Sequence, residues 1–389
     1  MRLTPLGRRL TLTALLLTGA GYALGYPAFV LLGAGALAVL AVAAVTLAAR
    51  PKVELSREVF PDRVTRGEPA VGLLTARSTA RRRSATVTVW DRHELGGRQG
   101  RIAVPLPQLP GQGVTESGYP IPTDRRGTAR LGPLDTRISD PFGLLVRDGQ
   151  AADRQTLLIH PRTHPFDLLA ASRSMDREGG GAETVLDGSV TFHRLREYVP
   201  GDDLRSVHWR SSARANKLMV RQNVDVTRPE VTVVLVTDQA AYPDPEMFEE
   251  AVEAAASVLM STGDTQIPAR LVTGETMTTG RGGPRDIRAA LDELAAVEVA
   301  DDGGLPRIAD RMRGVRSRGL LVIACGETTE ADLAAARRLA VGHRPALVGR
   351  FRRTAGDEPA AEEPALTVID TALAADFCRR WQRHAAAAL

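Results

Sequence analysis

The start of the chain is a long apolar run with a break at its middle. Residues 10–49 contain no charged side chain, and Gly25-Tyr26-Pro27 divides them into apolar segments at about 10–24 and 28–49. A helix needs about 20 residues to cross the hydrocarbon layer, so the second segment is long enough and the first must recruit its flanks. The pattern predicts a transmembrane helical hairpin within residues 1–52. A cleaved signal peptide is the competing interpretation, but the second apolar segment follows closely after the first.

Residues 53–169 change to a period of two. Ala85 to Trp90 alternates between small or polar and apolar side chains, and Gly96-Gly97 and Pro110-Gly111 mark turns. This pattern is typical of short antiparallel strands, so we expect a β-rich, sandwich-like module. Residues 170–188, which contain three consecutive glycines among polar side chains, are expected to form a flexible connector.

From Pro229 onward, buried strands alternate with amphipathic helices. Val231 to Val236 is a continuous apolar run, as expected of a parallel strand that is buried on both faces. Asp244-Pro245 supplies an N-cap and a first-turn proline for the next helix. Further strands are expected at 271–272, 320–324, 346–348 and 366–369, and further helices at 286–297, 305–312, 330–339 and from 374. The fold class is therefore α/β, with a doubly wound domain within residues 189–389 and a surface loop at 356–364.

Cations, aromatic residues and turn formers concentrate in residues 192–222. This segment holds seven Arg or Lys residues, opposed by Glu197, Asp202 and Asp203. Pro200-Gly201 predicts a turn and Asp202 an N-cap, followed by a short helix from about 204 to 213. Asn216 tolerates left-handed geometry, and a strand is expected from about residue 218. We also expect Trp209 to pack beneath a network in which Arg205 or Arg210 pairs with the acidic residues.

This segment resembles the signature of the DUF58 family, R-E-Y-x-x-G-D-x-x-R-x-I-x-W-x-x-[ST]-A-R. Three earlier stretches, RRG at 125–127, LGP at 131–133 and DPFGL at 140–144, are similar to other elements of that family. From residues 140–144 alone we expect a turn in which Asp140 caps local amides and Phe142 fills a core edge. The signature and docking candidates are Arg196, Glu197, Tyr198, Gly201, Asp202, Arg205, His208, Trp209, Arg210, Ala213 and Arg214.

The resemblance implies a membrane-attached protein with a domain similar to the von Willebrand factor A fold. It also implies two partners, a MoxR-type AAA+ ATPase and a transglutaminase-like membrane protein. The family is defined by an unknown function, so the resemblance names no reaction. We therefore expect a non-enzymatic scaffold or adaptor in which the Arg-rich segment braces the soluble modules or docks the partner.

The distribution of charge argues against nucleic acid as a partner. Residues 1–52 hold five cations and no acidic residue, which leaves 45 of the 50 cations against all 46 acidic residues in the remaining 337 positions. From residue 229 onward, 18 cations face 25 acidic residues. A phosphate backbone is bound through a surplus of cations, which the soluble part lacks. The basic residues instead flank the apolar run, at Arg8-Arg9 and at Arg50 and Lys52, and predict that both ends are cytoplasmic.

Two chemical sites remain candidates. Von Willebrand factor A domains bind Mg²⁺ through a D-x-S-x-S motif at the end of a strand. Here Asp238 is followed by Ala240 and Tyr242 in the two serine positions. No metal or other cofactor is therefore expected, and Asp238 is a weak candidate for a metal ligand. Asp202, Asp203 and His208 could serve a hydrolase or phosphotransferase, and Arg210 and Arg214 could hold an anion. No nucleophile elbow or phosphate-binding glycine loop accompanies them, so no catalytic residue is assigned.

The two cysteines, Cys325 and Cys378, fall in a predicted strand and a predicted helix. Buried free thiols are the expected state, with a disulfide or a reactive thiol as the alternative. Arg81-Arg82-Arg83 is expected to be a solvated loop, or a contact for anionic lipid headgroups if that loop faces the membrane.

Overall fold

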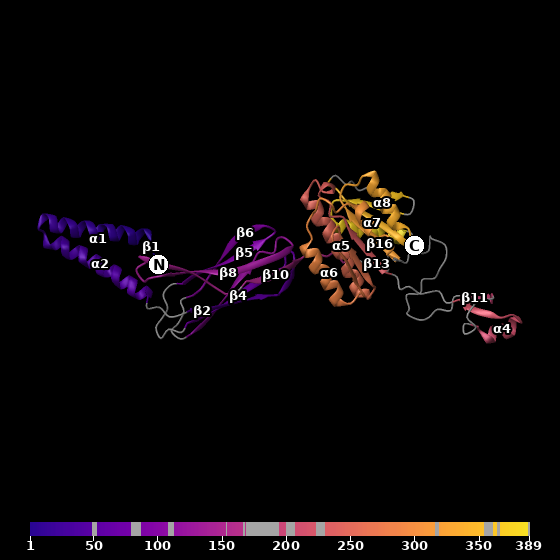
Figure 1. The fold of residues 1–389 in the computed structure, drawn as a ribbon, viewed down its shortest axis with the longest axis horizontal. Helices are drawn as coiled ribbons and strands as arrows, with labels where there is room; N and C mark the ends of the chain where they lie inside the picture. The colour runs from indigo at the N-terminus through magenta and orange to yellow at the C-terminus, as the bar shows by residue number, and fades with distance from the viewer. Residues whose placement is uncertain are drawn as a thin grey trace. The chain divides into compact units, whose positions relative to one another are not determined.

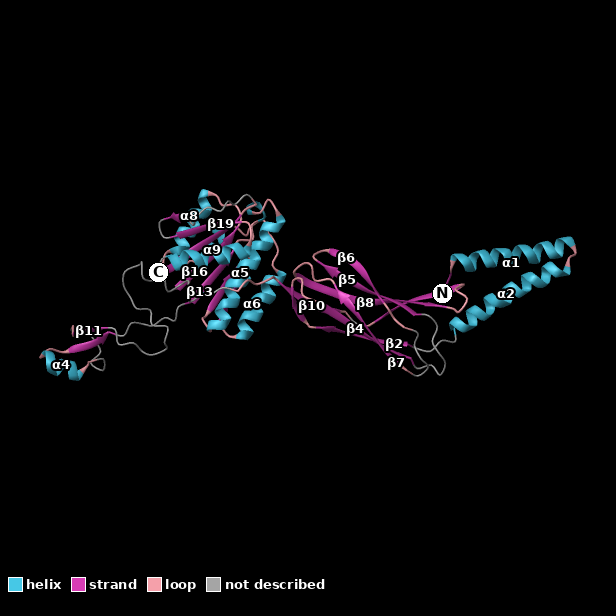
Figure 2. Ribbon diagram, turned by 180° about the vertical axis from the view of Figure 1, so that it is seen from behind, coloured by secondary structure: helices cyan, strands magenta, loops and turns pink. Residues whose placement is uncertain are grey.

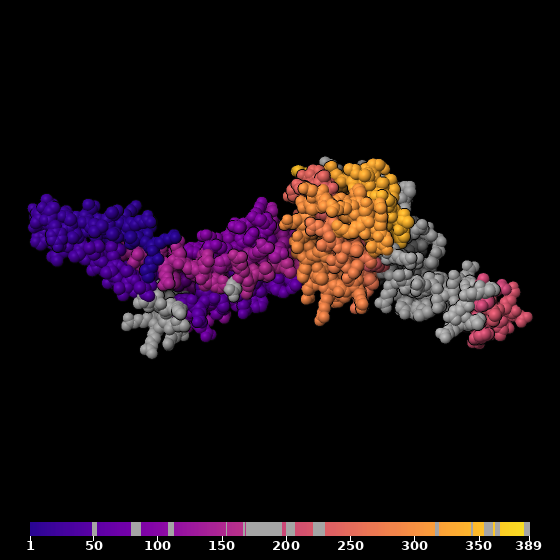
Figure 3. Space-filling model, in the orientation of Figure 1, coloured from indigo at the N-terminus to yellow at the C-terminus, as the bar shows by residue number. Residues whose placement is uncertain are grey.

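A computed structural model describes residues 1–48, 53–78, 87–107, 113–152, 154–165, 168, 194–199, 207–222, 230–315, 319–353, 361–363 and 366–387. The chain forms two compact units, residues 1–161 and 162–389, which the colour scale of Figures 1 and 3 follows from indigo to yellow. Helices and several sheets confirm the mixed α/β class (Figure 2). The connector predicted at 170–188 lies outside the described residues. Leu168, assigned above to the β-rich module, packs instead in the core of the second unit.

Two helices open the first unit, α1 (Pro5–Leu24) and α2 (Pro27–Ala48). Gly25 ends α1 in the left-handed conformation with φ 72°. The helices pack against each other through small residues, because a Cβ at Gly33 would collide with Thr18. Among the described residues, α2 is the helix that is long and apolar enough to cross a membrane. Helix α1 begins earlier than predicted and includes Arg8 and Arg9.

Two sheets make up the rest of the first unit. One contains β2 (Val53–Phe60), β4 (Ala70–Ser78) and β7 (Val114–Ile121). The other contains β1 (Arg2–Leu3), β3 (Arg63–Thr65), β5 (Val87–Leu95), β6 (Arg98–Val104), β8 (Gly127–Ser139), β9 (Leu145–Ala151) and β10 (Gln155–His160). Apolar side chains of both sheets, such as Leu74 on β4 and Leu131 on β8, form one core. The predicted alternation continues along β5, where Val87 and Val89 are buried.

A buried charge network crosses this core. The Arg57 guanidinium donates to Asp91 Oδ1 at 2.7 Å and to the Leu131 carbonyl at 3.1 Å. The Tyr119 hydroxyl donates to the other Asp91 oxygen at 2.6 Å. The side chains of Arg57 and Asp91 are both 0% exposed. Burial, followed by the hydrogen bond to Asp91, raises the pKa of Tyr119 well above its usual range.

The turn between β8 and β9 contains the DPFGL stretch. Asp140 accepts from the amides of Phe142 at 2.8 Å and Leu145 at 2.5 Å, which confirms the predicted capping. Phe142 is 51% exposed, so the expectation that it fills a core edge is wrong. The carboxylate occupies the inside of the turn, and the phenyl ring is left outside it.

The second unit is built on a seven-stranded sheet in the order β15-β14-β13-β16-β17-β19-β18. The strands are β13 (Glu230–Leu235), β14 (Ala269–Val272), β15 (Met277–Gly280), β16 (Gly319–Cys325), β17 (His343–Phe351), β18 (Ala361–Glu363) and β19 (Leu366–Thr371). The five inner strands are parallel, and β15 and β18 pair antiparallel at the edges. Strand β18 falls within the predicted surface loop at 356–364, so that prediction is wrong for these three residues.

Helices cover both faces of this sheet, as predicted for a doubly wound domain. They are α5 (Pro245–Thr265), α6 (Pro284–Ala296), α7 (Leu305–Arg311), α8 (Glu330–Ala340) and α9 (Ala374–Ala387). Val231, Val233 and Leu235 of β13 pack in the core that contains α5, α6 and α9, whereas Val234 packs with α7 and α8. Asp244 caps α5 through the Glu246 amide at 3.0 Å, as its sequence predicts.

Both cysteines are buried free thiols, which confirms that expectation against a disulfide. Burial raises the pKa of Cys325 to about 12 and that of Cys378 to about 11. Because the thiolate is the reactive species, these values favour structural thiols over reactive ones.

Candidate functional site

The signature segment folds as a two-stranded ribbon with a short helix between its strands. Strand β11 (Arg194–Glu197) pairs antiparallel with β12 (Met219–Gln222), and α4 (Trp209–Ala215) lies between them in sequence. An isolated bridge joins Val207 to Val220, just before the helix begins. Figure 1 shows this ribbon and helix as one small group of elements. Helix α4 therefore lies in sequence between two strands that are hydrogen-bonded to each other, and this pair of strands forms its base.

His208 begins the helix, not Asp202 as the sequence analysis predicts. Its Nδ1 accepts from the Ser211 amide at 3.3 Å and lies 2.8 Å from the Ser211 hydroxyl. The helix accordingly starts at Trp209, five residues later than expected. Gly201, Asp202, Asp203 and Arg205 lie outside the described residues. His208 Nδ1 is thus engaged in capping α4.

Ser212 ties the helix to the ribbon. Its hydroxyl donates to the His208 carbonyl at 3.1 Å and accepts from the Met219 amide at 2.8 Å. Asn216 ends the helix in the left-handed conformation with φ 51°, as predicted from its tolerance of that geometry. These contacts fix the buried side of α4 and leave its other side to solvent.

The outer face of α4 carries an aromatic side chain and two cations. Trp209 is 67% exposed, so the expectation that it packs beneath the segment is wrong. Arg210, Ala213 and Arg214 are also exposed. Within the described part of the chain, neither Arg210 nor Arg214 forms an ion pair, whereas Glu197 pairs with Lys217 at 3.2 Å. We call Trp209, Arg210, Ala213 and Arg214 the α4 face.

The remaining candidates lie at the base of this face. Arg196 and Glu197 belong to β11, where Arg196 pairs in register with Val220 and Glu197 with Met219. The amide of Tyr198 donates to the Leu218 carbonyl at 2.8 Å and extends the ribbon by one step. These residues support the α4 face through the backbone.

The sheet of the second unit reverses its order between β13 and β16, which is where ligands gather in open α/β sheets. Here Tyr242 fills the space beyond these strand ends and is 5% exposed. Its hydroxyl donates to the Val236 carbonyl at 2.8 Å, and its ring packs edge-on against Phe248 at 5.1 Å. Burial raises its pKa well above the usual value. Gly326 lies against the ring, where a Cβ would come within 2.8 Å of Tyr242 Cδ1.

Asp238 follows β13 and caps a single 3₁₀ turn (Gln239–Ala241). Its Oδ1 accepts from the Ala240 amide at 3.0 Å. Across the described residues, no group of three His, Cys, Asp or Glu side chains is arranged to hold a metal ion. The carboxylate that begins a D-x-S-x-S site thus serves here as a local turn cap.

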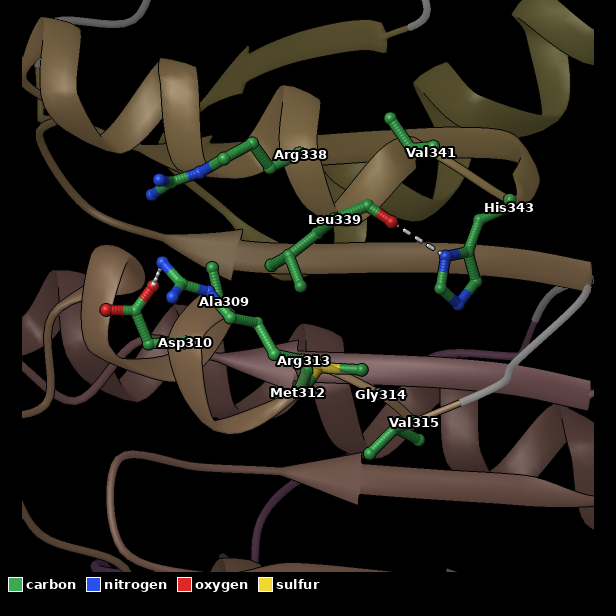
Figure 4. A pocket seen from close by; sticks show the side chains of 11 residues that line it. Ala309, Asp310, Met312, Arg313, Gly314, Val315, Arg338, Leu339, Val341 and His343 are labelled. Carbon is green, nitrogen blue, oxygen red and sulfur yellow. Dashed lines mark hydrogen bonds and ion pairs between the residues drawn. The ribbon is translucent and has the colours of Figure 1, made fainter.

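A cavity of about 450 Å³ opens at the opposite end of the strands, where α7 and α8 end and β17 begins (Figure 4). Met312 and Leu339 supply apolar walls, and Arg313 and Arg338 supply cations. His343 Nδ1 lies 2.7 Å from the Leu339 carbonyl, so this nitrogen carries the proton. Burial lowers the pKa of His343, and its Nε2 has no hydrogen-bond partner in the described structure. Sequence analysis missed this cavity because its side chains belong to no motif.

Comparison with known proteins agrees with the sequence resemblance. Residues 194–348 match the family model described as "Protein of unknown function DUF58". The uncharacterized protein YeaD of Bacillus subtilis (strain 168) is 25% identical over 144 residues, which is 37% of this chain and 35% of that protein. The match thus spans about a third of the length of this curated relative.

Two solved structures each resemble part of the chain. The CARDB domain of a Pyrococcus furiosus protein is 9% identical, with 28% of this chain and 90% of that chain covered at a TM-score of 0.19. Spo0M, a sporulation control protein from Bacillus subtilis, is 10% identical, with 32% and 55% covered at a TM-score of 0.18.

Proposed function

With residues 194–348 matched to DUF58, a family of unknown function, we propose that this chain is a membrane-anchored, non-enzymatic scaffold. In this proposal the α4 face binds another protein, and the anchor holds that face at the cytoplasmic side of the membrane. The observation that carries the proposal is the exposure of Trp209 beside Arg210 and Arg214, which form no ion pair with any described residue, on a hydrogen-bonded base. Trp and Arg are the side chains most enriched where protein partners bind strongly.

The proposed anchor is the pair α1 and α2. Twenty helical residues span about 30 Å, which is the thickness of the hydrocarbon layer. Helix α2 meets this length without a charge, and α1 meets it if Arg8 and Arg9 extend their charged ends to the headgroups. In this proposal the cations at both ends of the pair keep the two soluble units on the cytoplasmic side. The protein would be a multi-pass protein of the cell membrane.

The proposed partner is a MoxR-type AAA+ ATPase, as the DUF58 resemblance implies, with a transglutaminase-like membrane protein in the same assembly. We also propose that the second unit is a von Willebrand factor A-like domain, because its sheet has a core of five parallel strands, with an antiparallel strand at each edge. In it, Tyr242 occupies the region where such domains bind a metal, which is consistent with a scaffold that binds without an ion. His208 is engaged in capping, which weakens the case for a hydrolase that uses it as a base.

Reversing the charge of the α4 face is expected to weaken capture of the ATPase. The full chain in lipid nanodiscs, as wild type and as Arg210→Glu/Arg214→Glu, is mixed with the purified MoxR-type ATPase and ATP, and the bound fraction is measured. Two reversed charges at an interface are expected to lower the affinity at least about tenfold, or about 1.4 kcal/mol.

The matched control is Arg285→Glu/Arg288→Glu, because these arginines are exposed on α6 and the variant has the same net charge. The control is expected to bind like the wild type. Equal binding by all three proteins, with unchanged thermal unfolding, would contradict docking through the α4 face.

A further inference from the structure

The exposed turn around Phe142 is fastened to the beginning of the first helix. The Thr4 amide donates to the Leu144 carbonyl at 2.9 Å, and the Thr4 hydroxyl donates to the Gly143 carbonyl at 2.7 Å. Just before Thr4, strand β1 pairs with β9, so that Leu3 lies opposite Leu145. These bonds join segments that are about 140 residues apart in the sequence.

The close approach also explains a glycine in the helix. A Cβ at Gly7 would collide with the Leu144 carbonyl oxygen. Thr4 is at the same time the N-cap of α1, because its hydroxyl oxygen accepts from the Gly7 amide at 3.0 Å. The turn is therefore fixed to the first helical residues themselves, and Phe142 is held within two residues of the Thr4 contacts.

This attachment sets the depth of Phe142 relative to a bilayer. If the two helices span the hydrocarbon layer as proposed above, Gly25 and Tyr26 lie at the far interface and Pro5 lies at the near one. Since α1 is about 30 Å long, which is the thickness of the hydrocarbon layer, its first turn then lies close to the cytoplasmic interface. Phe142, joined to this turn, must then lie among the headgroups or at the boundary with the acyl chains.

The side chains around the attachment suit that boundary. Phe142 is 51% exposed, Leu6 57% and Met1 62%. Met1 and Leu6 lie in or just before the first turn of α1 in the sequence, and Phe142 is next to the residues that bond to Thr4. Arg8 and Arg9 are exposed on the same turn region. Apolar side chains together with arginines are typical of segments that lie in the interface of a membrane with anionic lipids.

We propose that the DPFGL turn is a membrane-interface contact, in which Phe142 inserts between lipid headgroups and holds the β-sheet unit at the bilayer surface. The ligand is the phospholipid bilayer, and the Thr4 bonds to residues 143 and 144 keep the phenyl ring at this depth. This inference rests on the proposed anchorage and extends it from the helices to the soluble unit. Asp140 contributes because its carboxylate accepts from the amides of Phe142 and Leu145, which holds the turn in the form that exposes Phe142.

The test measures the depth of single added tryptophans in the full chain, reconstituted in vesicles of phosphatidylcholine and phosphatidylglycerol. Phe142→Trp is compared with Phe60→Trp, because Phe60 is similarly exposed at 57% but lies at the far end of β2. That position is about 23 Å along the strand from Val53, which follows the second helix. Leu37→Trp, at the middle of α2, reports insertion of the helices. The emission of the parent protein is subtracted in each case.

Lipids brominated near the headgroup are expected to quench the added emission of Phe142→Trp, whereas Phe60→Trp is expected to keep its emission. Lipids brominated deep in the acyl chains are expected to quench Leu37→Trp. If Leu37→Trp is quenched and Phe142→Trp emits like Phe60→Trp, the helices are inserted and the contact proposed for the turn is wrong. If Leu37→Trp is not quenched by any brominated lipid, the anchorage itself fails, and this inference fails with it.

Discussion

Replacing Asp91 with Asn is expected to lower the free energy of unfolding of the β-sheet unit by about 3–5 kcal/mol. The two oxygens of Asp91 accept from Arg57 and from Tyr119, and both ionic side chains are fully buried. Asparagine keeps the shape of the side chain but replaces one acceptor with an NH₂ group. The Arg57 charge then loses the carboxylate with which it pairs in the described core, and one donor loses its acceptor.

Native-state hydrogen exchange of the full chain measures this effect locally, in the peptides that cover β2, β5 and β7. Asp148→Asn is the control, because its ion pair with Arg137 is partly exposed, and such pairs contribute about 1 kcal/mol or less. An equal and small change in both variants would show that the Arg57, Asp91 and Tyr119 network does not stabilise the unit. The α/β unit should exchange as in the wild type.

Replacing Tyr242 with Ala is expected to destabilise the second unit by about 3–5 kcal/mol, since it removes a buried aromatic side chain and leaves a cavity at the order reversal of the sheet. The ring contacts Phe248 and lies against Gly326, and its hydroxyl is bonded to Val236. Tyr242→Phe keeps the ring and is expected to cost only about 1 kcal/mol, for the lost hydrogen bond.

The measurement is again hydrogen exchange, in peptides covering β13 and β16. A large loss for Tyr242→Ala and a small one for Tyr242→Phe would show that the ring fills this position as a structural element. Losses below about 1 kcal/mol in both variants would contradict that role, because a filled site cannot lose an aromatic ring at so little cost.

The elements with a strong local pattern were predictable from the sequence. The apolar run at β13, the cap at Asp244 and the left-handed Asn216 each depend on neighbouring residues alone, and the structure has them as expected. The alternation of strands and helices likewise predicted a sheet covered on both faces. These features depend on periodicity and on backbone preference, which a sequence displays directly.

The site was less predictable, because its geometry depends on which of several competent residues is used. Asp202 and His208 can both cap a helix, and the structure uses His208 for α4, which brings Trp209 to the exposed side. A tryptophan in an arginine-rich segment is ordinarily assigned to a core, so its exposure was missed. The composition of the segment was evident, but the side that faces solvent was not.

Contacts between segments that are far apart in the sequence could not be predicted from the pattern of residues. Nothing in the local sequence of Thr4 indicates its bonds to Gly143 and Leu144, and nothing around His343 indicates the cavity that it lines. Each joins segments through the tertiary fold, which periodicity and capping rules do not encode. Tyr242 was partly predictable. The sequence shows a tyrosine at the second serine position of the D-x-S-x-S motif, but it does not indicate the hydrogen bond of this tyrosine to Val236.

The most direct test of the scaffold proposal is site-specific photocrosslinking from the α4 face in membranes. A benzophenone amino acid replaces Trp209 in one variant and Leu373 in another, since Leu373 is also exposed but lies before α9. Both variants are irradiated with the MoxR-type ATPase and ATP, and the adducts are identified by mass spectrometry. We expect an adduct with the ATPase from position 209 and none from position 373. Adducts at equal yield from both positions, or no protein adduct from position 209, would contradict the proposal that this chain binds its partner through the α4 face.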